Sequence, residues 1–291
     1  MSTAAATQVL DDASVPQLRP QRLLPKDVGI PIRTLGQTYD EAMPKWWVGN
    51  NPFLTAFFAT FSATLPEGEL QFVYSVRLFQ DRITDPVLKA QVRAFVGQEG
   101  QHRNEHDAAN AEMKRRGLRL DRIEKSVQSM NKMMRERQSP AQQLAGTVCG
   151  EHITALMADV ALQKYPRLLE MTAEPARQLW AWHAIEETEH KAVAFDVYDQ
   201  LVGDRKLLRR TMVVATIFFF LLNFYHAFRL LPLKDWFRPK MWWEAFGVIG
   251  QLIRRSRKDY MDFYKPDFHP WQHDNKEAVK AAKLKYLGEA A

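Results

Sequence analysis

The sequence predicts an all-α protein with a four-helix bundle at its centre. Apolar residues recur at helical spacing in one segment after another, and no segment shows the alternating, β-branched pattern of a strand. The motif Glu-x-x-His also occurs twice, at Glu99–His102 and at Glu187–His190. Residues three apart lie on one face of a helix, so each pair can direct a carboxylate and an imidazole at one point. Two such helices that face each other in a bundle can hold a pair of metal ions.

Composition is that of a globular protein. The chain has 291 residues, 46% hydrophobic and 25% charged, which suits one large domain with tails or a small module. The single cysteine, Cys149, excludes a disulfide framework and a cysteine-rich zinc site, and we interpret it as a small buried residue. No apolar run follows a basic start, so we expect no secretory signal peptide. The net charge of +6 comes without an aromatic–basic motif, which argues against nucleic acid and suits an anionic membrane surface.

Four parts follow one another along the chain. The first is rich in proline and lacks a helical period, so we expect a disordered start and then an extended arm around the body. The second contains both motifs, the third is apolar and then amphipathic, and the fourth is a tail with a short Lys-rich helix. The parts are residues 1–35 for the flexible arm, 36–204 for the bundle, 205–264 for the apolar and amphipathic helices, and 265–291 for the tail.

Prolines, glycines and capping residues set the expected ends of the bundle helices. Asn50 and Asn51 can cap a helix that has Pro52 in its first turn, and we expect this helix over about 40–64. The run at 65–68, which contains Pro66 and Gly68, is expected to break it. Further helices are expected over 69–80, 87–116, 121–137, 139–163 and 175–201, with stops at Gly117 and Gly203 and an end or bend at Pro166.

Residues 211–228 form an uncharged segment between Arg210 and Arg229. As a helix it spans about 27 Å, close to the ~30 Å hydrocarbon core of a bilayer. Basic residues flank both ends, so the charges give no orientation, and four aromatic residues follow as interfacial anchors would. Three interpretations stay open: the helix lies in or on a membrane, spans it, or covers the bundle as a buried helix. Residues 241–264 then predict an amphipathic helix with a basic end.

Four of the expected helices each supply a glutamate, and two supply the paired histidines. These residues are Glu69, Glu99, Glu151, Glu187, His102 and His190. Their separations suit antiparallel helices with a longer crossover between the second and third, so the side chains can converge in the bundle core. Carboxylate and imidazole ligands suit iron or manganese, and four carboxylates neutralise two divalent ions. We therefore expect two iron ions, with manganese or a mixed pair as alternatives, and a catalytic role for the four glutamates.

Two further histidines share faces with the motif residues. His106 lies seven residues after Glu99 and His183 lies four before Glu187. Each is an additional ligand, a partner that orients a ligand, or a hydrogen-bonded bundle histidine. Two other polar residues precede the motif glutamates; each either orients the histidine of the opposite helix or has a solvated or structural role. These are Gln98 and Glu186.

Other acidic residues compete for the same roles. Glu67 competes with Glu69 but falls in the expected break, and Glu186 competes with Glu187 because it lies four residues from His190. We prefer Glu187, which repeats the spacing of the first motif. Two more side chains point away from the ligand face and are interpreted as structural: His152 and Glu105.

These motifs resemble a known family. The segments that carry the resemblance are Leu65-Pro66-Glu67-Gly68-Glu69-x-x-Phe72, Gln98-Glu99-x-x-His102-x-x-x-His106, Glu151-His152 and Glu187-x-x-His190. Over about residues 30–270 they look like the bacterial predicted metal-dependent hydrolases, whose motifs are similar to those of ferritin-like di-iron carboxylate proteins. The pattern His183-x-x-x-Glu187-x-x-His190 is similar to the p-aminobenzoate N-oxygenase group, whose site has one more histidine. The resemblance implies a ferritin-like bundle and makes His183 a seventh ligand.

Three functions are compatible with this pattern. The first is a di-iron oxygenase, hydroxylase or desaturase that uses dioxygen and an external electron donor, which can be a protein. The aromatic-rich segments after residue 211 favour a hydrophobic, lipid-like substrate delivered from a membrane. The second is hydrolysis by water activated on a metal pair, and the third is non-catalytic metal binding. We expect a cytoplasmic protein at the inner face of the membrane, with a homodimer as one option for its assembly.

Overall fold

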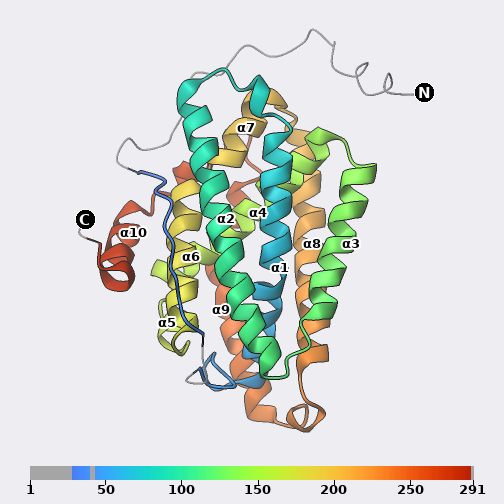
Figure 1. Ribbon diagram of the computed structural model, residues 1–291, viewed down its shortest axis with the longest axis vertical. Coiled ribbons are helices and arrows are strands. Elements are labelled where there is room, and N and C mark those ends of the chain that lie inside the picture. The colour runs from blue at the N-terminus through green and yellow to red at the C-terminus, as the bar shows by residue number, and fades with distance from the viewer. Residues whose placement is uncertain (1–27, 40–42, 290–291) are drawn as a thin grey trace.

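The computed structural model describes residues 28–39 and 43–289, and helices dominate this part of the chain. It contains no β-strand beyond one isolated bridge between Val48 and Thr172. Figure 1 shows long helices packed side by side along one common direction. The prediction of an all-α protein is therefore confirmed. The expected disordered start, residues 1–27, lies outside the described residues.

Four long helices surround the polar centre of the molecule. They are α1 (Pro52–Arg77), α2 (Pro86–Arg115), α4 (Pro140–Asp159) and α6 (Ala176–His190). α1 packs against α2, and α4 packs against α6. Between the second and third of them, α3 (Asp121–Arg137) lies along the outside of α1 and makes the longer crossover (Figure 1).

α1 begins at the proline that the sequence indicated. The side chain of Asn51 accepts hydrogen bonds from the backbone N–H groups of Phe53 and Leu54, and Pro52 occupies the first turn. The expected start near residue 40 is wrong, because residues 44–50 form turns and a bridge ahead of this cap.

The expected break at residues 65–68 is also wrong, because α1 continues through Pro66 to Arg77. Proline has no N–H to donate to the carbonyl four residues back, which here belongs to Ser62. Asn110 of α2 supplies the missing donor, since its Nδ2 lies 3.1 Å from the Ser62 carbonyl oxygen. A side chain from the neighbouring helix thus satisfies the carbonyl that the proline leaves free.

The single helix expected over residues 175–201 is in fact two helices. α6 ends at His190, and α7 (Val193–Leu201) begins after a two-residue turn. The sequence has no proline or glycine between 176 and 202 to signal this break. The turn residue Lys191 donates hydrogen bonds to the His273 carbonyl at 2.7 Å and to Asn275 Oδ1 at 2.9 Å. Contacts with the distant C-terminal segment therefore accompany the break.

Both glycines expected to stop helices do so with left-handed backbone conformations. Gly117 follows α2 with φ of 89°, and Gly203 follows α7 with φ of 68°. Glycine adopts these angles without the steric cost that a Cβ would bring.

Two apolar clusters lie on either side of a polar layer in the bundle. One cluster includes Phe53 and Phe57 near the start of α1, and the other includes Val76 at its end. α2 contributes to both clusters, with Met113 in the first and Leu88 in the second. α6 contributes to the first cluster, and α7, which follows it, contributes to the second. Glu69 lies between them on α1, at the level of the polar layer.

The segment 28–39 runs as an extended chain along α2 and α6 (Figure 1). Ile32 sits directly on Gly97, where an added Cβ would lie 2.2 Å from Ile32 Cδ1. Gln98 also donates a hydrogen bond to the Pro31 carbonyl at 2.9 Å. On the same side, α10 (Lys276–Ala282) packs against α6.

Two helices after the bundle cover α1 and α4. α8 (Arg205–Leu230) and α9 (Pro239–Asp262) both pack on these two helices. α8 is long and apolar enough to cross a membrane by length and composition, yet only 22% of its most apolar window is buried in the structure. The buried-helix interpretation therefore describes one face of α8 and not the other. Its exposed face carries Val213, Val214, Ile217, Phe218, Leu221 and Tyr225.

Candidate metal centre

Eight carboxylate and imidazole side chains converge in the polar layer of the bundle. None of them is more than 4% exposed. α1 and α4 each contribute one glutamate, whereas α2 and α6 each contribute one glutamate and two histidines. They are Glu69 from α1; Glu99, His102 and His106 from α2; Glu151 from α4; and His183, Glu187 and His190 from α6.

Glu99 and Glu187 lie between the two motif histidines. His190 Nε2 is 3.2 Å from Glu99 Oε1 and 3.5 Å from Glu187 Oε2. His102 Nδ1 is 3.7 Å from Glu99 Oε1 and 3.9 Å from Glu187 Oε1. Glu151 is on the His190 side, with its Oε2 at 3.3 Å from His190 Nε2. This arrangement gives two neighbouring positions that share the carboxylates of Glu99 and Glu187.

Many polar atoms at the centre are buried without a hydrogen-bond partner among the described residues. Such orphaned groups are rare in proteins and costly when charged. Here they face one another, as ligands around cations do, and they are oxygen and nitrogen donors of the kind that iron and manganese accept. The donor set therefore fits two divalent ions. The orphaned atoms are both carboxylate oxygens of Glu69, Glu99 and Glu151, Nδ1 of His102, and Nε2 of His183 and His190.

Burial sets the protonation of the cation-free centre. It raises the pKa of Glu69 and of Glu99 well above the usual range, with the charge of Glu151 adding to the effect in both. It also raises the pKa of Glu151 to about 7. Burial lowers the pKa of His102 well below its ordinary value, so this ring is neutral and keeps a lone pair for a cation. The cation-free centre thus holds protons that bound cations would displace.

Glu187 is the exception among the four glutamates. Burial would raise its pKa, but the close approach of the His183 and His190 rings outweighs burial and holds the pKa well below the usual range. At His190, burial would lower the pKa. The nearby charges of Glu151 and Glu187 outweigh burial and hold the pKa of His190 well above its ordinary value. Charge is therefore concentrated between α4 and α6.

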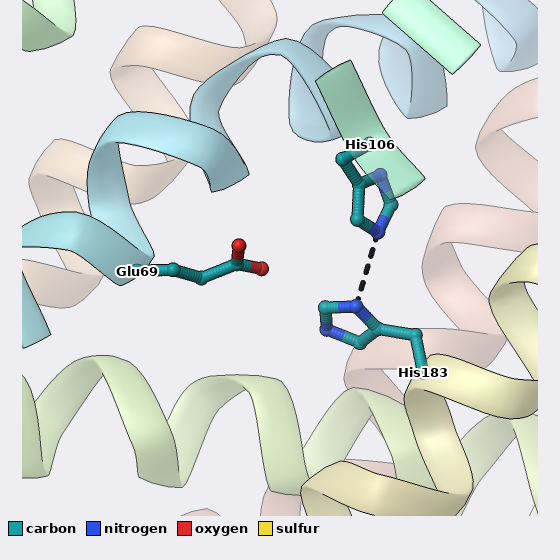
Figure 2. Close-up of side chains that lie close together, drawn as sticks. All are labelled: Glu69, His106 and His183. Carbon is teal, nitrogen blue, oxygen red and sulfur yellow. Dashed lines mark hydrogen bonds between the residues drawn. The ribbon is translucent and has the colours of Figure 1, made fainter. Parts of the chain in front are cut away.

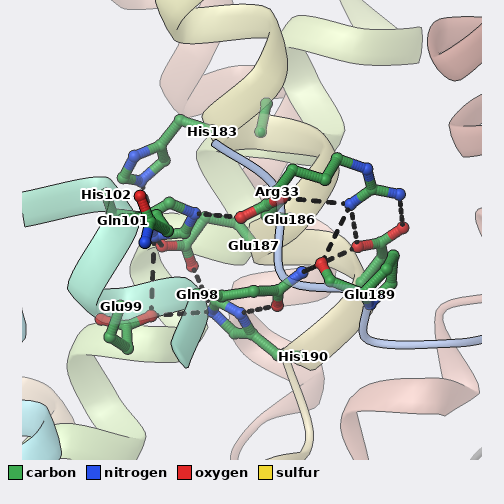
Figure 3. Close-up of polar contacts among 12 residues, drawn as sticks. Arg33, Gln98, Glu99, Gln101, His102, His183, Glu186, Glu187, Glu189 and His190 are labelled. Atoms are coloured by element: carbon green, nitrogen blue, oxygen red, sulfur yellow. Dashed lines mark hydrogen bonds and ion pairs between the residues drawn. The ribbon is translucent and has the colours of Figure 1, made fainter. Parts of the chain in front are cut away.

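Two hydrogen bonds cross between α2 and α6 and fix the motif histidines (Figure 3). His190 Nδ1 lies 2.9 Å from Gln98 Oε1, and His102 Nε2 lies 3.1 Å from Glu186 Oε2. Each bond engages the ring nitrogen that faces away from the centre. His190 Nε2 and His102 Nδ1 are left to face the glutamates.

Arg33 contacts the residues behind both orienting groups (Figure 3). No motif in the sequence points to this arginine. Its guanidinium bonds both oxygens of Glu189, at 2.8 and 2.9 Å, and Glu186 Oε1 at 3.1 Å. Glu189 in turn accepts a hydrogen bond from Gln98 at 2.9 Å. One signal was available, because α6 carries more carboxylates than a metal pair needs, and the surplus Glu186 and Glu189 require a cation from elsewhere.

His106 and His183 form a hydrogen-bonded pair (Figure 2). His106 Nε2 lies 3.0 Å from His183 Nδ1, and His106 Nδ1 lies 2.9 Å from Ser62 Oγ. Both nitrogens of His106 therefore have protein partners, which favours an orienting role over a ligand role. His183 keeps Nε2 free at 3.1 Å from Glu187 Oε1, and Figure 2 shows the ring on the side of Glu69.

The competing residues lie away from the centre. Glu67 is a helical residue that accepts a hydrogen bond from Gln128 of α3, so its expected placement in a break is wrong. Glu105 accepts a hydrogen bond from the Gly36 N–H at 2.6 Å and anchors the extended arm. Two further residues face α8, α9 and the tail: buried Cys149 and His152.

A small apolar cavity of about 40 Å³ adjoins the centre between α1, α4, α5 (Arg167–Glu170) and α6. His183 and Glu187 form its polar side, together with Thr154, whose hydroxyl donates to Glu187 Oε2 at 2.5 Å. The remaining wall is hydrocarbon, aromatic and thioether, and it includes Phe61 and Met157. Among residues 28–39 and 43–289, no lysine or arginine lines this cavity.

One family model matches most of the chain. Its description is a predicted metal-dependent hydrolase, and the match covers residues 31–274. This range contains the arm residue Arg33 and every side chain of the polar centre. No curated protein and no solved structure matches the chain. The chain belongs to the family of predicted metal-dependent hydrolases.

Proposed function

We propose that the protein is a metal-dependent enzyme in which a dinuclear centre, of iron or alternatively of manganese or a mixed pair, uses dioxygen to oxidise an apolar substrate. The observation that carries the proposal is the apolar cavity against His183 and Glu187. Dioxygen can enter such a space without a desolvation cost, whereas a phosphoester would find no cationic side chain among the described residues of its wall. Oxidation at this wall therefore fits the site better than phosphoester cleavage does.

Seven side chains would hold the two ions. When bound, the metal pair supplies the reduction of dioxygen with electrons from an external donor. The four glutamates would balance the charge of two divalent ions. Glu99 and Glu187 would both take part in holding them, since each approaches both motif histidines. The seven are Glu69, Glu99, His102, Glu151, His183, Glu187 and His190.

The surrounding residues prepare the centre without joining it. Gln98 and Glu186 hold the rings of His190 and His102, and His106 holds that of His183. Thr154 keeps a proton at the edge of the cavity, on its bond to Glu187. The apolar wall excludes water, which protects reactive species from side reactions.

Hydrolysis is the second candidate function, and the family's description supports it more directly than it supports oxygen chemistry. The same donor set can hold two ions that lower the pKa of a water molecule. A hydrolase of this kind would work with zinc or manganese, without dioxygen and without an electron donor.

Metal analysis and oxygen uptake separate the two functions. We expect protein from iron-replete cells to contain two iron ions per chain and, after anaerobic reduction, to consume dioxygen with a change in absorption. Glu99→Ala should lose iron and oxygen uptake together, while Glu105→Ala, on the same helix but bonded to the arm, should keep both. Zinc in place of iron, with ester cleavage at equal rates in air and under nitrogen, would establish hydrolysis instead.

We further propose that the exposed face of α8 rests on the cytoplasmic side of a membrane. α8 lies along α1 and α4, so it fits a helix in the surface better than one that crosses the bilayer apart from the bundle. Ile217 and Leu221 are 55% and 65% exposed on this face. The double variant Ile217→Asp, Leu221→Asp should abolish co-sedimentation with anionic vesicles, and unchanged co-sedimentation would refute the placement.

A further inference from the structure

A second, larger cavity opens between α8 and α9. The two helices meet near one end, where Thr216 Oγ1 lies 3.0 Å from Tyr260 OH, and near the other, where the rings of Phe228 and Trp242 are 5.7 Å apart. Between these contacts the cavity has a volume of about 270 Å³. Its floor is made by α4 and α1: Phe57, Ile153, Leu156, Met157 and Val160.

The cavity is almost entirely apolar, and one arginine side chain lines it. Arg257 is exposed, lines the cavity, and makes no hydrogen bond or ion pair with any residue that the structure describes. The hydroxyl groups beside it are already engaged, since Ser256 donates to the Leu252 carbonyl at 2.9 Å and Thr216 pairs with Tyr260. The guanidinium is thus the group in this wall that is free to bind an anion.

Met157 connects this outer cavity to the small cavity at the metal centre. Its side chain lines both, and on the inner side the same cavity reaches Glu187 and His183. Methionine is unbranched and flexible, so it can change rotamer to open a continuous path where a leucine or phenylalanine would be stiffer. The route from Arg257 past Met157 leads to the carboxylates of the centre.

We propose that the outer cavity binds a single-chain carboxylic acid. The carboxylate would pair with Arg257, whose planar fork matches it in two hydrogen bonds, and the alkyl chain would lie along the apolar floor toward Met157. One guanidinium balances one negative charge, which matches one carboxylate per cavity. The exposed apolar face of α8 is next to this opening, so a membrane would be the reservoir of the acid.

This inference names the substrate class and rests on the proposed function for the fate of the bound chain, while binding itself requires no metal. Binding is measured by displacement of the fluorescent fatty acid cis-parinaric acid from the full-length protein. We expect one site per chain and affinity that rises from the ten- to the sixteen-carbon acid by up to about fourfold per buried methylene. Hexadecanol and a lysophospholipid serve as the neutral and the headgroup-bearing competitors.

Matched variants locate the head group. Arg257→Gln should weaken the binding of hexadecanoic acid at least tenfold and leave the binding of hexadecanol unchanged. Arg254→Gln is the control, because Arg254 is exposed on the same helix, bonds Gln251 at 2.8 Å and does not line the cavity. Equal losses in both variants, tighter binding of the lysophospholipid, or no binding of any acid would overturn the proposal.

Met157→Trp tests the inner route with a residue that fills the passage. We expect this variant to weaken the binding of the sixteen-carbon acid strongly and that of the ten-carbon acid little. The thermal unfolding midpoint shows whether the variant is folded. Equal effects on both chain lengths would overturn the inner route. Iron content and oxygen uptake are also measured on the unsubstituted protein. If that protein retains two iron ions but binds no acid, this inference is refuted and the proposed function stands.

Discussion

His102 and His190 each carry a hydrogen bond on the nitrogen that faces away from the centre, and the partner lies on the opposite helix. The bonds fix the tautomer of each ring, and they also tie α2 to α6 at the height of the ligands. Gln98 makes a further contact that Glu186 cannot make: its amide also donates to Glu189, which Arg33 binds. Gln98 thus links the His190 ring to Glu189 and Arg33.

Gln98→Leu should weaken metal binding about 10- to 100-fold, since His190 loses the acceptor that orients it. The measurement is metal retained per chain in competition with a chelator. Gln101→Leu is the matched control, because Gln101 lies on α2 and bonds only the exposed Thr34 among the described residues. Similar losses in both variants would show that Gln98 acts through general packing.

Metal affinity should rise with pH through the neutral range. Burial raises the pKa of Glu151 to about 7 from an ordinary 4.5, so its contribution to the stability of the cation-free protein is complete below pH 4.5 and lost as pH rises through 7. Cations need the ionised form, so affinity should increase by about tenfold per pH unit for each proton displaced. Calorimetry in two buffers should show at least one proton released per chain at pH 6, and a pH-independent affinity would contradict this.

The ligand glutamates and histidines could be recognised from the sequence because spacings of three, four and seven each place residues on one helix face. Arg33 could not, since it comes from an extended segment with no period and pairs with α6, some 150 residues away along the chain. His106 illustrates the same limit, because spacing placed it on the right face but could not reveal that Ser62 and His183 use both of its nitrogens.

At the scale of elements, α1 shows how a neighbouring helix overrides a local signal. Pro66 and Gly68 are both poor helix residues, and together they predict a break. The structure keeps the helix because the Asn110 amide binds the free Ser62 carbonyl. The continuous helix carries Glu69 into the centre at a fixed height, which a loop would not do.

Asn110→Ala should destabilise the protein by about 1–3 kcal/mol, because it leaves a buried carbonyl without a donor. Pro66→Ala restores the N–H that can bond Ser62 within the helix, so the same Asn110 substitution should cost less in that background. Chemical denaturation of the four proteins in this double-mutant cycle measures the coupling. Additive costs would show that Asn110 acts through its other bond, to the Ser62 hydroxyl.

Helix positions were predictable wherever a cap or a stop is encoded locally. Asn51, Gly117 and Gly203 mark ends that the structure confirms. The turn after His190 has no such residue, and it coincides with Lys191 reaching the His273 carbonyl, a contact 82 residues away. Local sequence cannot encode an end that a distant partner helps to set.

At the scale of the molecule, the extended arm at residues 28–39 and the C-terminal segment after α10 meet on α6. Arg33 from the extended arm bonds Glu289 at 2.6 Å as well as Glu186 and Glu189, and Lys283 reaches Glu189 at 2.5 Å. Both α6 carboxylates are fully buried at the side chain. The arm and the tail therefore balance charges that the bundle alone would leave unpaired.

Arg33→Met should lower the free energy of unfolding by about 3 kcal/mol, since it leaves buried carboxylates short of a partner. It should also weaken metal binding, because Glu186 and Glu189 lose the contact that holds them against His102 and Gln98. Arg103→Met is the control, because Arg103 is half-exposed and its ion-pair partner among the described residues is Asp107 at 3.7 Å. A stability equal to the control would show that Lys283 alone satisfies the pair.

The clamp formed by Arg33 and Glu289 joins positions 256 residues apart. During synthesis the last ligand, His190, leaves the ribosome well before Lys283 and Glu289 do. Until then Glu186 and Glu189 of the nascent chain lack the basic side chain of Lys283, and Arg33 lacks its partner Glu289. We therefore expect loading with metal to follow synthesis of the C-terminal segment, so that ribosome-bound intermediates remain in the metal-free form.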